Sequence, residues 1–204
     1  MTALRDVARA QLRAARPINL ADKYANPRAL LRHHVAKGEL IRLAPGYYMA
    51  PPDDRPLPWR PTIETATAAI ATTAYPGEEI ALMGLTAARL HGALPRAIGA
   101  GIVAVPRQHA PITLDDGGQV VFVTRDTARL DGVRMPVETG RVLVTTVEQT
   151  VLDLARRPNL GGLETEAHAA IENLMPRVDT EHLLALADEQ HFGRRAAGLI
   201  EATR

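Results

Sequence analysis

The segment from Asn19 to Ala50 constrains the fold more than any other part of the chain. Asn26 is a good helix N-cap, and Pro27 suits the first helical position, where no intrahelical N–H bond is needed. Gly38 then supplies the left-handed residue that commonly ends a helix. Two runs with strand-like composition follow, ELIRL and GYYMA, and they flank a Pro-Gly turn. The segment therefore predicts one capped helix followed by a short hairpin.

That helix has an apolar and a basic face. At 100° per residue, one arc contains Leu30, Leu31, His34 and Val35. The opposite arc contains small residues together with Arg28, Arg32, His33 and Lys37. An α-helix fits the major groove of DNA, where Arg and Lys side chains contact phosphates and guanine edges. We therefore interpret the segment as the second half of a winged helix-turn-helix, with these four polar residues as DNA-binding candidates.

The hairpin would form the wing. Because strand side chains alternate, we expect Arg42 and one of the two tyrosines, with Tyr47 as the candidate, to point away from the core. Residues 20–25 would form the short helix beneath the recognition helix, packed through Leu20 and Tyr24. A solvated amphipathic helix followed by an ordinary hairpin is the alternative interpretation.

Residues 3–16 predict an amphipathic helix with its arginines on one side, at spacings of four, four and three. Either this is a charged, solvated face, or the helix lies beside the DNA backbone. In the second case Arg5, Arg9 and Arg13 would contact phosphates.

The charge distribution supports a polyanion partner for the amino-terminal part. Residues 1–60 contain eleven Arg or Lys against five Asp or Glu, whereas the remainder contains thirteen against eighteen. A basic part joined to an acidic part indicates that the first meets nucleic acid and the second does not.

Several chemistries are excluded or disfavoured by composition. The chain has no Cys and no Ser, so disulfides, thiolate metal sites and Ser or Cys nucleophiles are excluded. Lysine occurs only at positions 23 and 37, which disfavours a nuclease site of the Glu-x-Lys type in the larger part. The seven histidines show no zinc-ligand spacing, and no glycine-rich phosphate loop is present. We predict a protein without enzymatic activity, cofactor or metal.

Five prolines between residues 50 and 61 predict an extended linker. We therefore expect a winged helix-turn-helix domain at 1–50, a linker at 51–61 and a domain at 62–204. Trp59 would plug one domain against the other. No segment approaches the ~20 apolar residues of a membrane span, and the first residues lack a signal-peptide core, so we expect a cytoplasmic protein.

The second part mixes helices and strands, which predicts an α+β chain whose larger α/β domain ends in a helical tail. Thr62, Thr86 and Thr146 are candidate helix caps, and a turn at Asp115–Gly118 would join two strands. The tail would comprise helices at roughly 163–175, 180–190 and 194–203.

Three patterns carry a family resemblance: LLRHHVAKGELIRLAPGYYMAP, GLTAARLHGAL and TTVEQTVLDLARRP. Together they resemble the AbiEi-type antitoxins of type IV toxin-antitoxin systems, including their mycobacterial relatives. The resemblance implies that the winged helix represses the operon by binding promoter DNA, and that the carboxy-terminal domain neutralises a nucleotidyltransferase toxin encoded beside it. It also implies operator contacts by Arg28, Arg32, His33, Lys37 and Arg42. His34 stands where such helices usually bury a leucine. The alternative function is a winged-helix regulator that senses a small ligand.

Overall fold

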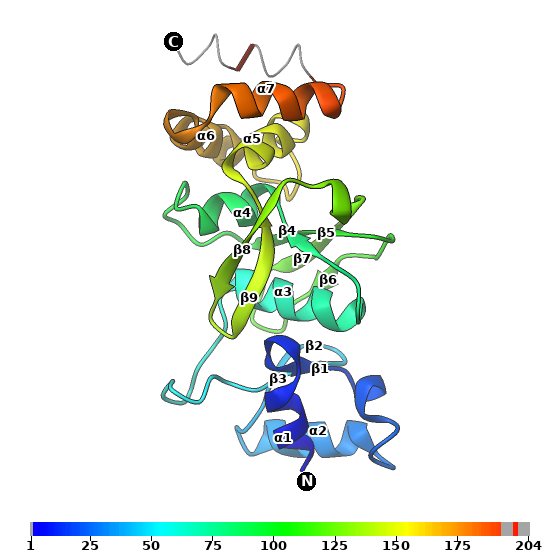
Figure 1. Cartoon of the computed structure of the whole chain (residues 1–204). Helices are drawn as coiled ribbons and strands as arrows, with labels where there is room; N and C mark the ends of the chain where they lie inside the picture. The colour runs from blue at the N-terminus through cyan, green and yellow to red at the C-terminus, as the bar shows by residue number, and fades with distance from the viewer. Residues whose placement is uncertain (1, 193–197, 200–204) are drawn as a thin grey trace.

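The computed structural model describes residues 2–192 and 198–199. It has three layers: an amino-terminal module, a six-stranded sheet with one helix beneath it, and a group of carboxy-terminal helices (Figure 1). The module lies at the opposite end of the molecule from the carboxy-terminal helices. The predicted mixture of helices and strands is confirmed.

The amino-terminal module is a small three-stranded sheet covered on one side by helices. Its sheet is antiparallel, in the order β1-β3-β2. Its elements are α1 (Ala3–Arg9), η1 (Gln11–Arg13, a 3₁₀ helix), β1 (Ala14–Ala15), η2 (Pro17–Leu20, also 3₁₀), α2 (Pro27–Ala36), β2 (Ile41–Ala44) and β3 (Tyr47–Met49). Helix α2 has the predicted ends, because Asn26 Oδ1 accepts a hydrogen bond from Ala29 N at 3.2 Å and Gly38 has φ +72°.

Two predictions within this module are wrong. The helix expected over residues 3–16 ends at Arg9, since Leu12 and Arg13 adopt left-handed backbone conformations with φ of 51° and 56°. The chain then forms β1 against β3 instead. The helix expected over residues 20–25 is the earlier 3₁₀ helix η2. Leu20 still packs against α2 as predicted, in a cluster that includes Leu31.

The larger sheet has the strand order β6-β7-β5-β4-β9-β8. Its strands are β4 (Ala81–Leu82), β5 (Ala100–Val105), β6 (Ile112–Thr113), β7 (Gln119–Thr124), β8 (Gly132–Val137) and β9 (Gly140–Thr145). Strand β5 pairs in parallel with β7, and β4 pairs in parallel with β9. The other three pairings are antiparallel.

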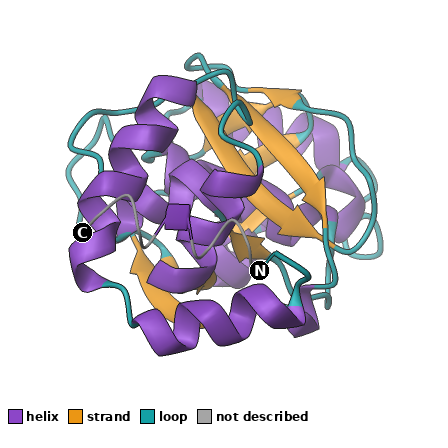
Figure 2. Ribbon diagram, turned by 90° about the horizontal axis from the view of Figure 1, so that it is seen from above, coloured by secondary structure: helices purple, strands orange, loops and turns teal. Residues whose placement is uncertain are grey.

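Both faces of the central strands β4 and β5 are buried. On β5, Val103 and Val105 face the core shared with α3 (Ile63–Ala74), and Ile102 and Ala104 face the core of the carboxy-terminal helices. That core is formed by α4 (Gly84–Leu90) together with the carboxy-terminal helices α5 (Val147–Arg156), α6 (Glu164–Leu174) and α7 (Thr180–Glu189). Seen from above, they lie over part of the sheet (Figure 2).

Helix α3 is enclosed between the sheet and the amino-terminal module. Every residue from Glu64 to Thr73 is buried. One side of the helix packs on the sheet, and η1, β1 and β3 contact it from the module. The side chains of Leu12, Leu43 and Met49 belong to the same core cluster as Ile70. The two predicted domains therefore share one core.

The linker region contains no helix or strand between residues 51 and 61. Trp59 is only 8% exposed and joins the shared core, as predicted. Its Nε1 donates a hydrogen bond to Glu138 Oε1 at 3.2 Å, at the β8–β9 turn. The division into domains at 1–50, 51–61 and 62–204 stays a prediction.

Most local signals in the second part are confirmed. Thr62 and Thr146 cap α3 and α5, and the Asp115–Gly118 turn joins β6 to β7. Thr86 is not a cap: α4 begins at Gly84, and Thr86 Oγ1 accepts a hydrogen bond from Ile102 N at 2.6 Å. Strand β8 was not predicted. The helix expected over residues 194–203 lies almost wholly outside the described residues.

Candidate nucleic-acid interface

Helix α2 presents a basic face to solvent. Its apolar face is anchored by Leu31, which is fully buried against Val7, Leu20 and Leu40. On the other side Arg28, Arg32, His33 and Lys37 are exposed. Within residues 2–192 and 198–199, none of these four side chains forms an ion pair. The structure brings together the four helix residues that the sequence selected.

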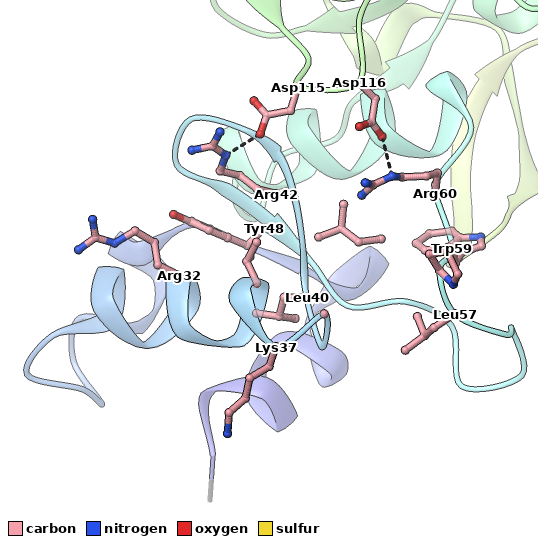
Figure 3. A pocket seen from close by; sticks show the side chains of 14 residues that line it. Arg32, Lys37, Leu40, Arg42, Tyr48, Leu57, Trp59, Arg60, Asp115 and Asp116 are labelled. Atoms are coloured by element: carbon pink, nitrogen blue, oxygen red, sulfur yellow. Dashed lines mark hydrogen bonds and ion pairs between the residues drawn. The ribbon is translucent and has the colours of Figure 1, made fainter.

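Two grooves run beside this helix and share Arg32 and Tyr48 among their lining residues. One, of about 730 Å³, lies between the start of α2, η2 and the β2–β3 turn. The other, of about 680 Å³, lies between the end of α2, β2 and the linker (Figure 3). We name the two together the α2 furrow. Its cationic lining residues are Arg16, Arg28, Arg32, Lys37, Arg42 and Arg60.

His34 does not disturb the packing of α2. Its side chain is 15% exposed, and Nδ1 lies 2.6 Å from Glu39 Oε2 in a hydrogen bond. This bond lowers the pKa of Glu39. Where the resemblance implies a buried leucine, this chain has a histidine that pairs with a carboxylate just beyond the helix end.

The β2–β3 hairpin differs from its predicted orientation in one respect. Arg42 is exposed, as expected, and lines the furrow. Tyr47 is only 5% exposed, so its expected outward orientation is wrong, and burial raises its pKa. The reason is that β3 is the central strand of its sheet, with α1 and α2 on one face and α3 on the other. The side chains of Tyr47 and Tyr48 point to opposite faces of the small sheet, but both of these faces are covered.

The arginines of the first sixteen residues have different surroundings. Arg5 and Arg9 are exposed on α1, but no residue of α1 is among those described as lining the furrow. The Arg13 side chain is only 19% exposed, against 50% for Arg42, and it pairs with Asp53 through two hydrogen bonds, of 3.1 and 2.6 Å, so it is less accessible to phosphate than the furrow cations. The left-handed turn at Arg13 directs it to the linker.

Sequence analysis missed Arg16 and Arg60 as candidates. The sequence pattern places Arg16 in a predicted helix that in the structure ends at Arg9, and it places Arg60 in the proline-rich linker. One usable signal was Pro17, because the residue before a proline favours an extended backbone over a helical one.

The second domain contains two polar clusters among the described residues. Asp153 is buried, which raises its pKa, and it pairs with Arg125 at 3.0 Å and Gln149 at 3.1 Å. His182 Nε2 lies 2.7 Å from Asp131 Oδ2, and the hydrogen bond raises the pKa of His182. Both clusters connect elements of the domain.

The second cluster is also the one described group that could hold a metal ion. Ligand atoms of Asp131, Glu148 and His182 lie within 4.8 Å of one another. The spacing of histidines along the chain does not reveal this group, because its three residues come from three separate elements. One oxygen of each carboxylate already accepts a hydrogen bond, Asp131 Oδ2 from Thr146 Oγ1 and Glu148 Oε1 from Asp179 N. Through these hydrogen bonds, the three residues connect α7, α5 and the loop before β8.

Residues 80–201 match a family model described as "AbiEi antitoxin C-terminal domain". This match defines the class: an antitoxin of a toxin-antitoxin system, which is a regulatory kind of protein. Because it spans well over half of the 204 residues, the chain belongs to the AbiEi antitoxin family. The sequence resemblance is therefore confirmed.

A solved structure supports the fold. The chain is similar to the RV2827C protein from Mycobacterium tuberculosis, with a TM-score of 0.61 and 19% identity, over 98% of this chain and 75% of that chain. No curated protein matches the sequence. Among the described residues, no helix is long and apolar enough to span a membrane.

Proposed function

We propose that this antitoxin is also the repressor of its own operon, and that the α2 furrow binds promoter DNA. The observation that carries the proposal is the row of exposed cations without ion-pair partners among the described residues: Arg28, Arg32 and Lys37 on α2. Such side chains are free to neutralise phosphates, and counterion release then drives binding.

The surrounding elements support the same proposal. Helix α1, strand β1, a second short helix, α2 and the β2–β3 hairpin follow each other in the order of a winged helix, with the sheet order β1-β3-β2. In such a domain α2 is the recognition helix and the hairpin is the wing. The module also lies at the end of the molecule away from α5, α6 and α7, so these helices do not cover α2 (Figure 1).

A salt series on the protein's own promoter tests DNA binding. With about six phosphates neutralised, affinity falls on the order of a thousandfold between 50 and 200 mM salt. The triple variant Arg28→Gln/Arg32→Gln/Lys37→Gln should bind more weakly, with a salt slope that is shallower by about 2.7, since each lost phosphate contact removes about 0.9.

The matched control removes the same charge elsewhere. Arg96, Arg129 and Arg157 are exposed residues of the second domain and lie outside the furrow. Their triple change to Gln should leave the slope near that of the parent. A promoter that the parent protein does not bind, or equal slopes for the two triple variants, would rule out the furrow as the DNA-binding site.

We further propose that the system is of type IV and that the second domain counteracts a nucleotidyltransferase toxin encoded by the neighbouring gene. The match of residues 80–201 to the antitoxin domain supports this assignment. Co-expression of the two genes is the test: growth should recover when the antitoxin is present. Growth that stays arrested despite soluble antitoxin would contradict it.

A further inference from the structure

The turn between β6 and β7 extends from the second domain to the proposed DNA-binding site. The backbone N of Asp115 donates a hydrogen bond to Leu43 O on β2 at 2.9 Å. Its Oδ2 accepts a hydrogen bond from Arg42 Nε at 2.5 Å. The next residue, Asp116, lies 3.4 Å from Arg60 Nε (Figure 3). Two of the six furrow cations are therefore occupied by one acidic turn.

These two carboxylates are the only acidic groups among the described residues that line the furrow. They stand beside a surface that is otherwise cationic, where they repel an approaching phosphate and pair with two groups that would attract it. A turn that only joins two strands does not require carboxylates that repel phosphate or that pair with arginines. The arrangement instead has a direct consequence for DNA binding.

We propose that the Asp115–Asp116 turn competes with DNA phosphates for Arg42 and Arg60, and so limits the affinity of the α2 furrow for DNA. This inference rests on the proposed DNA-binding function and concerns its regulation. In the parent protein the aspartates keep the two arginines from contacting phosphate, and because both pairs are open to solvent, the arginines can bind phosphate once the carboxylates are removed. The side chains are 50 and 26% exposed in the Arg42–Asp115 pair, and 63 and 53% in the Arg60–Asp116 pair. Exposed ion pairs are weak and exchange readily.

The turn itself does not depend on its carboxylates. The hydrogen bond from Asp115 to Leu43 uses backbone atoms, and the flanking strands pair at Ile112 with Val120 and at Thr113 with Gln119. Replacing both aspartates by asparagine therefore removes the charge while it keeps the turn in place.

The competition couples the second domain to the DNA-binding site. Any event in the second domain that moves the turn away from β2 frees two cations and strengthens DNA binding. By thermodynamic reciprocity, DNA binding weakens the hold of the turn on β2 to the same extent.

The test compares salt series on the promoter for the parent and for Asp115→Asn/Asp116→Asn. Two additional phosphate contacts should make the slope of log affinity against log salt steeper by about 1.8, and affinity at 100 mM salt should rise by about tenfold or more. Glu172→Gln/Glu181→Gln is the matched control, since it removes two exposed acids from the distant helices α6 and α7. Its slope should equal that of the parent.

A second comparison isolates the two arginines. In an Arg42→Gln/Arg60→Gln background, the aspartate changes should no longer alter the slope. An unchanged or shallower slope for the Asp115→Asn/Asp116→Asn protein, with an unaltered melting temperature, would overturn the proposal and show that the turn merely positions the wing. If the parent protein fails to bind the promoter, the proposed function fails instead, so the two failures are distinguishable.

Discussion

Gly101 shows how closely α3 packs on the sheet. A Cβ at this position would lie 1.7 Å from Thr67 Oγ1 and 2.9 Å from Thr67 Cβ. We expect Gly101→Ala to destabilise the protein by about 1–3 kcal/mol, the usual range for overpacking a core. Urea denaturation of the purified variant measures the change.

Gly99 is the matched control, because a Cβ there would meet nothing within 4 Å and its backbone is not left-handed. Gly99→Ala should change the free energy of unfolding by only a few tenths of a kcal/mol. Thr67→Ala combined with Gly101→Ala should recover part of the loss, since the nearer of the two clashing atoms is then absent. Equal stability of the two alanine variants would contradict the packing argument.

The individual side chains also show what sequence reasoning could and could not reach. The exposure of Arg28, Arg32 and Lys37 follows from helical periodicity, which is a local property. The pairing of Arg13 with Asp53 and of Arg42 with Asp115 joins residues 40 and 73 positions apart. Such partners are set by the tertiary fold, so no pattern along the chain reveals them.

At the scale of elements, helix α7 is linked to the loop before β8 by the hydrogen bond between His182 and Asp131, whose strength depends on pH. Asp131 accepts a hydrogen bond from His182 and raises its pKa, and Glu148 and Asp179 add to the effect. A raised pKa in the folded state means that the pair stabilises the protein below the ordinary histidine pKa of ~6.5, and that this stability is lost as pH rises through the raised value.

We therefore expect His182→Gln to lower the melting temperature more at pH 6 than at pH 9. The side chains of His182 and Asp131 are 46 and 27% exposed, so the effect is small. A pair of this kind contributes up to about 1 kcal/mol, which is about 2–4 °C for a chain of this size. His168→Gln is the control, because His168 is exposed and its ion pair with Glu164 is long, at 3.8 Å. If His182→Gln lowered the melting temperature equally at both pH values, protonation of His182 would not be what strengthens the pair.

Element boundaries were predictable where the signal was local. Asn26, Thr62 and Thr146 cap the helices that the sequence assigned to them. The end of α1 was not predictable, because residues 10–16 continue its periodicity. There the pairing of Ala14 and Ala15 with β3 overrides helix propensity. Short strands with partners far along the chain are fixed by the sheet and not by their own residues.

At the scale of the whole molecule, the enclosed position of α3 joins the amino-terminal module to the antitoxin domain. The proline-rich segment predicted two parts with a linker, and a linker without helix or strand is present. Composition could not show that Leu12, Met49 and Trp59 complete the core around α3. The two parts therefore bury apolar side chains against each other in one core.

This packing predicts that residues 62–204 alone are much less stable than the full chain. Removing residues 1–61 exposes the side of α3 that contacts η1, β1 and β3. Each large apolar side chain that loses its burial costs about 1.5–3 kcal/mol, so loss of several should lower the melting temperature by about 10 °C or more. The control is a full chain with a protease site inserted between Asp54 and Arg55, which are exposed. After cleavage its two fragments should still elute together from a sizing column, because the shared core holds them. A 62–204 fragment that melts within a few degrees of the full chain, or cleaved fragments that separate, would show that the two parts are independent.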